Sequence, residues 1–283
     1  MEIRGSGHLE LDRSIDPRAK RRVNIDLSRV DHISVYGVVG IACAVLYAAQ
    51  EGLPLQILPP SSASASSFMS SLGFERFVQD TGLAACTLPI TTSPRPADVI
   101  VELRTFSSSE QLQPLQDLLW DRLGSTRNSH LRDALVEALW ELGANVTEHS
   151  GSMGIVAACV QRPNRRDAHV AFAVGDAGKG LRRSFLEGSR PHHPATDHEA
   201  ITLALTYLVS SVTDTGRGQG LTTTVKQAVE LQGKVVVRSG TARRSITSSR
   251  WNSASLSTLH LSGAASSVPE LPGMLVAADL PCR

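Results

Sequence analysis

Residues 141–149 read Glu-Leu-Gly-Ala-Asn-Val-Thr-Glu-His and end a helical pattern that begins near residue 130. Apolar residues upstream recur every three or four positions, which predicts one buried stripe along this helix. Glu141 and Asn145 are four residues apart, so their side chains point the same way about one turn apart. A carboxylate there can orient a water or hydroxyl group, and an amide oxygen suits Mg²⁺. Taken alone, a solvated helix face explains the same residues.

A second motif, Asp176-Ala-Gly178-Lys-Gly180, follows an apolar strand pattern. An ionised carboxylate only accepts hydrogen bonds, so Asp176 suits the exocyclic amine of adenine. The two glycines permit positive φ and a close approach of a ligand to the backbone. An ordinary turn between two strands is the simpler interpretation of this motif when it is judged alone.

A third motif comes just before a predicted helix and has glycine at every second position: Gly216-Arg217-Gly218-Gln219-Gly220-Leu221. Backbone N–H groups in such a loop, together with the helix N-terminus, favour an anion such as phosphate. Arg217 or Lys226 would add positive charge. The motif is neither a P-loop nor a dinucleotide fingerprint. A flexible linker is the alternative interpretation.

In this order the three motifs resemble the N, G1 and G2 boxes of the GHKL ATPase superfamily. The resemblance covers about residues 98–281 and implies a Bergerat α/β sandwich with an ATP lid at 181–215. It implies that Glu141 is the general base, that Asn145 binds Mg²⁺ and that Asp176 contacts adenine. The other residues that it implies for ATP binding belong to the two glycine motifs: Gly178, Gly180, Gly216, Arg217, Gly218, Gly220 and Leu221.

Within this superfamily the spacing of Glu141, Asn145 and His149 is most similar to the anti-sigma-factor serine kinases. Histidine kinases usually have asparagine at the position of Glu141 and a preceding phosphoacceptor-histidine helix, which this chain lacks. The resemblance implies a Mg-ATP-dependent serine/threonine protein kinase in bacterial signalling or transcription control. Its partner would be a sigma factor or a STAS-type antagonist, and a homodimer is compatible with it. The alternatives are an ATP-driven switch without kinase activity and a pseudo-ATPase scaffold.

The N-terminal part has a strand, helix, strand, helix order that predicts an α/β unit with a parallel pair of strands. We expect strands at 22–27 and 53–58, a helix that ends before Gly52, and one further helix at 66–79. This part resembles a STAS domain, the anti-sigma-antagonist fold, over about residues 20–80. Its turn reads Ser34-Val35-Tyr36-Gly37, so Val35 stands where kinase-regulated STAS proteins have the phosphoacceptor serine.

The expected domains are therefore a STAS-like unit at 1–85, a linker at 86–97 rich in Thr, Ser and Pro, and the ATP-binding unit at 98–283. We predict a contact between the helix at 38–49 and the ATP-binding unit. Packing of this helix on its own sheet alone is the competing expectation.

The ATP-binding unit is expected to hold helices at 110–123, 130–148, 199–209 and 221–231, with Ser129 as an N-cap. Strands are expected at 99–103, 153–161, 168–174, 234–238, 245–249, 257–261 and 274–280, and a polar stretch at 182–198. The last strand follows Pro272-Gly273-Met274, where the superfamily usually has Gly-Thr. The missing threonine predicts the loss of one hydrogen bond that supports the adenine carboxylate.

The composition limits the other classes of function. A net charge of +1 over 283 residues gives no bulk electrostatic reason to expect nucleic acid or an anionic membrane as a partner. The four cysteines form no C-x-x-C pair, so a zinc or redox motif is not expected. Cys43 and Cys159 lie in apolar runs and are predicted to be buried. Because 36–49 is too short to cross a bilayer and no signal-peptide pattern is present, we expect a cytoplasmic protein.

Overall fold

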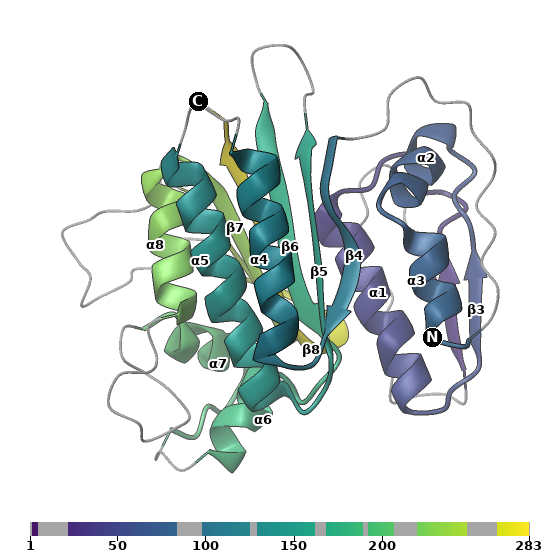
Figure 1. Ribbon diagram of the computed structural model, residues 1–283. Helices are drawn as coiled ribbons and strands as arrows, with labels where there is room; N and C mark the ends of the chain where they lie inside the picture. Colours follow the sequence, from purple (N-terminus) through teal and green to yellow (C-terminus); the bar gives the residue numbers. More distant parts are fainter. Residues whose placement is uncertain are drawn as a thin grey trace.

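A computed structural model describes most of the chain, namely residues 2–4, 22–83, 98–124, 129–161, 168–188, 192–206, 220–247 and 265–282. These residues form two sheets, one of three parallel strands and one of five antiparallel strands (Figure 1). The chain therefore has the mixed α/β character that the sequence predicts. The expected linker at 86–97 lies outside the described residues.

The parallel sheet has the strand order β1-β2-β3, with β1 at Glu2–Arg4, β2 at Val23–Asp26 and β3 at Leu55–Leu58. Helix α1, Val35–Gln50, connects β2 to β3. The hydroxyl of Ser34 caps this helix by accepting a hydrogen bond from the Gly37 N–H at 3.2 Å. The expected parallel pair is confirmed by the register of β2 against β3.

The prediction of a single helix at 66–79 is wrong, because two helices occupy this region: α2 at Ala63–Ser71 and α3 at Phe74–Asp80. Gly73 separates them with φ of 74°, a left-handed conformation that continues no helix. The preceding carbonyl, that of Leu72, accepts a hydrogen bond from the Leu103 N–H at 2.9 Å. The corner between α2 and α3 therefore contacts the edge of the second sheet.

The antiparallel sheet has the order β4-β5-β6-β8-β7. Its strands are β4 at Asp98–Phe106, β5 at Gly154–Gln161, β6 at His169–Asp176, β7 at Lys234–Thr247 and β8 at Ala265–Pro281. The prediction of two separate strands at 234–238 and 245–249 is wrong, since β7 is one continuous strand. A register shift at Gly240, where φ is 55°, lets one long strand bend instead of breaking. The strand expected at 257–261 lies outside the described residues.

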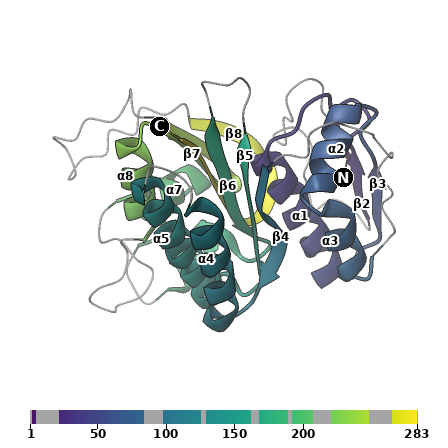
Figure 2. The ribbon, with the colours of Figure 1, turned by 45° about the horizontal axis from the view of Figure 1, so that its top comes forward.

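Three helices cover one face of this sheet: α4 at Ser109–Leu123, α5 at Ser129–Asn145 and α8 at Gly220–Glu230 (Figures 1 and 2). The apolar stripe predicted for the helix of Glu141 is confirmed, since its members are buried in the core between the helices and the sheet: Leu131, Leu135, Ala138, Leu139, Leu142 and Val146. Ser129 lies inside α5 as its first residue and is not the expected N-cap.

The region expected to form the lid contains two short helices, α6 at Gly180–Glu187 and α7 at Asp197–Ala204. The polar stretch expected at 182–198 therefore includes most of α6 and the start of α7. Phe185 is buried, whereas the charged residues of this helix, Arg182, Arg183 and Glu187, are exposed. Phe185 and the partly buried Leu181 supply the packing that a helix of this length needs.

Helix α1 lies between the two sheets, as both ribbon views show (Figures 1 and 2). Its buried side chains share one hydrophobic core with the parallel sheet and with residues of β5, β6 and β8. The predicted contact between 38–49 and the second unit is thus confirmed. The physical reason is that α1 is apolar on nearly all sides, and such a helix has to be covered on all sides.

Cys43 and Cys159 are both buried, as predicted. Over the described part of the chain, no helix combines the length and the hydropathy that a membrane span requires.

Candidate nucleotide site

Glu141 and Asn145 lie on the last turns of α5, both half-buried. After Asn145 the helix widens into a π-helical turn, Val146–Ser150 (η3), and it ends at Gly151 with φ of 71°. Such turns recur at functional sites because they displace the side chains of one turn from the regular helical pattern. Burial raises the pKa of the Glu141 carboxyl, and the charges of Glu137 and Glu148 raise it further. A raised pKa makes this carboxylate a stronger base.

Glu141 meets the first residue of α8. A Cβ on Gly220 would overlap Oε2 of Glu141, so a larger residue there would force this carboxylate to shift. The first N–H groups of α8, which have no partner within the helix, therefore lie beside the carboxylate. The structure thus brings together the predicted base and one predicted phosphate-binding residue, which are 79 positions apart in the chain.

The other residues of the third motif have different outcomes. Gly216, Arg217 and Gly218 lie outside the described residues. The side chain of Leu221 is buried in the core under α8, so only its backbone N–H can face a phosphate. Lys226 lies further along α8 and its Nζ is 4.0 Å from Oε1 of Glu230.

Asp176 ends β6 and is only 2% exposed. Its Oδ1 accepts a hydrogen bond from the Gly178 N–H at 2.8 Å, and its Oδ2 accepts one from the Met274 N–H at 3.2 Å. Burial raises the pKa of Asp176 to about 7, although these two N–H groups act in the opposite direction. The predicted loss concerned a threonine hydroxyl group, which Met274 cannot supply. The donor that β8 does provide to the carboxylate is the backbone N–H of Met274.

Two glycines hold the backbone around Asp176. A Cβ on Gly178 would overlap the carbonyl oxygen of Ser150, and a Cβ on Gly273 would overlap the carbonyl oxygen of Asp176. The Ser150 carbonyl also accepts a hydrogen bond from the Lys179 N–H at 3.0 Å. The turn after β6 is therefore fixed against the end of the π-helical turn, which brings the second motif next to the first.

Ser239 of β7 is a site residue that sequence reasoning did not find. Its hydroxyl accepts a hydrogen bond from the Leu181 N–H at 2.9 Å and donates one to the Gly273 carbonyl at 3.1 Å. It is 2% exposed and also lies against Gly180, which has φ of 70°. The start of α6 is thereby tied to the glycine beside Asp176. Only the pairing of β7 with β8 reveals this role, since no local motif surrounds Ser239.

The donor set fits Mg-ATP in one specific way. No group of three His, Cys, Asp or Glu side chains gathers as a metal site among the described residues. Asn145 has an amide oxygen, which would hold Mg²⁺ together with the phosphate and water oxygens of the octahedral shell that this ion prefers. Asp176 would accept from the adenine amine, and the N-terminus of α8 at Gly220 would face the phosphates.

Comparisons of the chain with protein-family models, with curated proteins and with solved structures found no match in any of the three. What the protein does is therefore inferred from the chemistry of its own residues.

Proposed function

We propose that this protein binds Mg-ATP and acts as a regulatory serine/threonine protein kinase of the anti-sigma-factor type. The observation that carries this proposal is the contact between Glu141 and Gly220, with Asp176 buried on the neighbouring strand end. These residues come from three distant motifs and gather at the same end of the antiparallel sheet. A base, a helix N-terminus suited to phosphate and a carboxylate suited to adenine are the parts that phosphoryl transfer from ATP requires.

Each residue has one role in this reaction. Glu141 accepts the proton of the attacking hydroxyl group, and the pKa raised by burial strengthens it as a base. Asn145 holds Mg²⁺, which neutralises the charge that develops on the phosphates. Asp176 orients the adenine ring, while its fixed hydrogen bonds to Gly178 and Met274 prevent it from turning away.

The acceptor hydroxyl belongs to a partner protein, by family analogy a sigma factor or a STAS-type antagonist. In the N-terminal unit of this chain, Val35 occupies the phosphoacceptor position and is 1% exposed. The neighbouring Ser34 is exposed, but its hydroxyl caps α1. Because the residue at the phosphoacceptor position has no hydroxyl group and is buried, the unit is better suited to contact the kinase than to receive its phosphate.

The first experiment is calorimetric titration with Mg-ATP of the wild type, of Asp176→Ala and of the control Asp121→Ala. Asp121 is an exposed carboxylate on α4 and lies far from the motifs in sequence. Binding to the wild type and the control, but not to Asp176→Ala, supports the proposal. No binding to the wild type at millimolar ATP would exclude both a kinase and an ATP-driven switch.

The second experiment measures transfer of labelled γ-phosphate to proteins that co-purify with the chain, in the wild type and in Glu141→Gln. We expect transfer to fall by about a hundredfold or more in Glu141→Gln, because a positioned general base contributes on that scale. ATP binding should stay within about twofold of the wild type, since the amide keeps the shape of the side chain. Equal transfer by both proteins would remove Glu141 from the mechanism.

One observation favours a second function, an ATP-driven switch without kinase activity. Helix α1 packs directly against β6, the strand that carries Asp176. A nucleotide that shifts the end of β6 would therefore change how the N-terminal unit is held. ATP binding that alters hydrogen exchange of α1, without phosphate transfer to any protein, would favour the switch over the kinase.

A further inference from the structure

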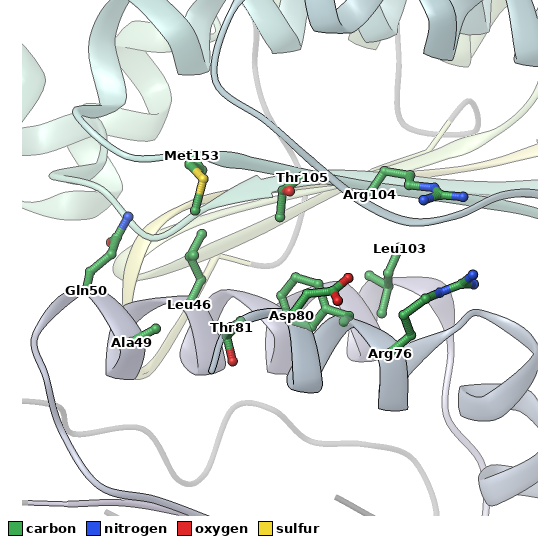
Figure 3. A pocket seen from close by; sticks show the side chains of 11 residues that line it. Leu46, Ala49, Gln50, Arg76, Asp80, Thr81, Leu103, Arg104, Thr105 and Met153 are labelled. Atoms are coloured by element: carbon green, nitrogen blue, oxygen red, sulfur yellow. The ribbon is translucent and has the colours of Figure 1, made fainter. Parts of the chain in front are cut away.

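A pocket of about 470 Å³ opens between α1, α3 and the edge strand β4, away from the nucleotide site (Figure 3). Gln50 and Met153 lie at one end of it, and Arg76 and Arg104 lie at the other. The volume is within the range of about 300–1,000 Å³ that small-molecule sites occupy. Such sites occur preferentially where two structural units meet, as the two sheets and their helices do here.

The walls of the pocket define the chemistry of a ligand. Side chains of Leu46, Phe77 and Leu103 supply an apolar surface. Arg104 supplies a guanidinium whose ion pair with Glu102 is long, at 3.7 Å, whereas Arg76 contacts the same carboxylate closely. Arg104 thus keeps N–H groups for an acidic group of a ligand.

Asp80 is the carboxylate among the lining residues, and its side chain lies between the two ends of the pocket (Figure 3). It would repel a second acidic group and would accept a hydrogen bond from an N–H or O–H donor. The matching molecule therefore has an apolar body, one acidic group and one hydrogen-bond donor.

A row of paired residues connects this pocket with the nucleotide site. In the register of the antiparallel sheet, one residue of each strand stands in the same row: Thr105, Ile155, Gly175, Leu275 and Arg238. Thr105 lines the pocket at one end of the row, and Gly175 immediately precedes Asp176. The row is the part of the sheet over which α1 lies.

Helix α1 makes the same connection by a shorter path. Cys43 lies against Gly175, and Leu46 and Ala49 follow at intervals of three residues and line the pocket. Residues three apart are neighbours on a helix surface, and each residue adds about 1.5 Å along the helix axis. The distance along the axis from Cys43 to Ala49 is therefore about 9 Å. From Val38 to Leu46 the helix is buried, and a close-packed interior transmits strain, so a displacement at Leu46 would reach Gly175.

We propose that the pocket between α1, α3 and β4 binds a small amphiphilic organic acid carrying a hydrogen-bond donor, and that this ligand changes the affinity for ATP through α1. The binding part of this inference is independent of the proposed function, whereas the coupling part rests on it. The ligand would act as an input signal, since it occupies a site separate from Glu141, Asn145 and Asp176.

The test uses the full chain and 8-anilino-1-naphthalenesulfonate as the probe, because it combines apolar rings, a sulfonate and an N–H group. Fluorescence titration compares the wild type with Ala49→Trp, which fills the pocket, and Arg104→Gln, which removes the cation. The control is Arg122→Gln, an exposed arginine on α4. Near-UV circular dichroism matching the wild type establishes that each variant is folded.

We expect one saturable probe site per chain, with a dissociation constant raised by about tenfold or more in both pocket variants and unchanged in the control. Equal binding to all four proteins, or no binding to the wild type, would overturn the site. Calorimetry with Mg-ATP at saturating probe then measures the coupling, expected as a change of about fivefold or more in the dissociation constant. An unchanged dissociation constant for Mg-ATP would overturn the coupling, whereas the inference of a ligand site in the pocket would stand. If the wild type bound no ATP at all, the proposed function would fail, and the probe titration would still decide the site.

Discussion

Cys43 of α1 lies directly behind Gly175, so that a Cβ on Gly175 would be 2.7 Å from Sγ of Cys43. Burial raises the pKa of the Cys43 thiol well above its usual range, and the charge of Asp176 raises it further, while Arg238 acts in the opposite direction. The thiol is therefore neutral and inert at physiological pH. Its importance is its size, since sulfur fills the space between α1 and the strand that ends at Asp176.

This contact predicts a compensating pair of substitutions. Gly175→Ala should lower the free energy of unfolding by about 1–3 kcal/mol, because the added methyl group overpacks the core. Cys43→Ala in the same chain removes the atom that the methyl group meets. Urea unfolding of both single variants and the double variant should therefore give a coupling energy of about 0.5 kcal/mol or more in the favourable direction. If the changes in the free energy of unfolding of the two single variants simply add in the double variant, Cys43 of α1 does not limit the space at Gly175.

Ser239→Ala separates the nucleotide site from stability in general. The substitution removes a buried hydroxyl that both accepts and donates a hydrogen bond, so it should cost about 1–3 kcal/mol of stability. Ser66→Ala is the matched control, because Ser66 is equally buried and donates to the Pro60 carbonyl at 3.1 Å. Calorimetry should show weaker ATP binding in Ser239→Ala alone. Equal ATP affinity in both variants would make Ser239 a purely structural residue.

The parts of the fold that follow from periodicity could be predicted from the sequence. The stripe from Leu131 to Val146 and the position of Gly52, with φ of 61°, are local patterns, and the structure has both. The contact of helix α1 with the second unit was predicted because tethering two units that resemble docking partners raises their effective concentration, and the structure adds that this helix is apolar on nearly all sides. The break at Gly73 was missed, since an isolated glycine within a helical pattern is often tolerated.

The candidate site likewise contains residues that local patterns predict and residues that they do not. Glu141, Asn145 and Asp176 could be singled out because their motifs are short and contiguous. Ser239 and the Met274 N–H could not, since each acts through strand pairing that joins residues 58 and 98 positions apart. Long-range register leaves no local trace in the sequence. The long strands β7 and β8 were underestimated for a related reason, because β8 continues through Pro269 and Pro272, which reads locally as a break.

Gly220→Ala tests the approach of α8 to the predicted base. The new methyl group would overlap Oε2 of Glu141 and displace its carboxylate. We expect the dissociation constant for Mg-ATP to rise by about tenfold, whereas stability should change by less than about 1 kcal/mol because alanine favours a helix more than glycine does. In the background of Glu141→Ala the overlap is gone, so adding Gly220→Ala should leave ATP affinity unchanged. A loss of affinity that persists in that background would place the effect in the glycine loop itself.

The pKa of Asp176 predicts opposite pH dependences for stability and for binding. Asp176 keeps its proton up to about pH 7 in the folded protein, whereas its ordinary pKa is 3.8. Across this interval the folded state holds more protons than the unfolded state, so the free energy of unfolding falls as the pH rises, by up to about 4 kcal/mol from this group. Adenine requires the ionised carboxylate as an acceptor, so ATP affinity should increase as the pH rises through 7.

Urea unfolding and Mg-ATP calorimetry at pH 5.5 and 8.5, on the wild type and on Asp176→Asn, measure both effects. The amide cannot titrate, so the loss of stability between the two pH values should be smaller in Asp176→Asn by the contribution of this one group. The variant should also bind ATP weakly at both pH values. Its NH₂ group is a hydrogen-bond donor and cannot accept from another donor such as the adenine amine, whereas a carboxylate only accepts. An identical pH dependence in the two proteins would show that Asp176 is already ionised at pH 5.5, and that solvent reaches it despite its burial.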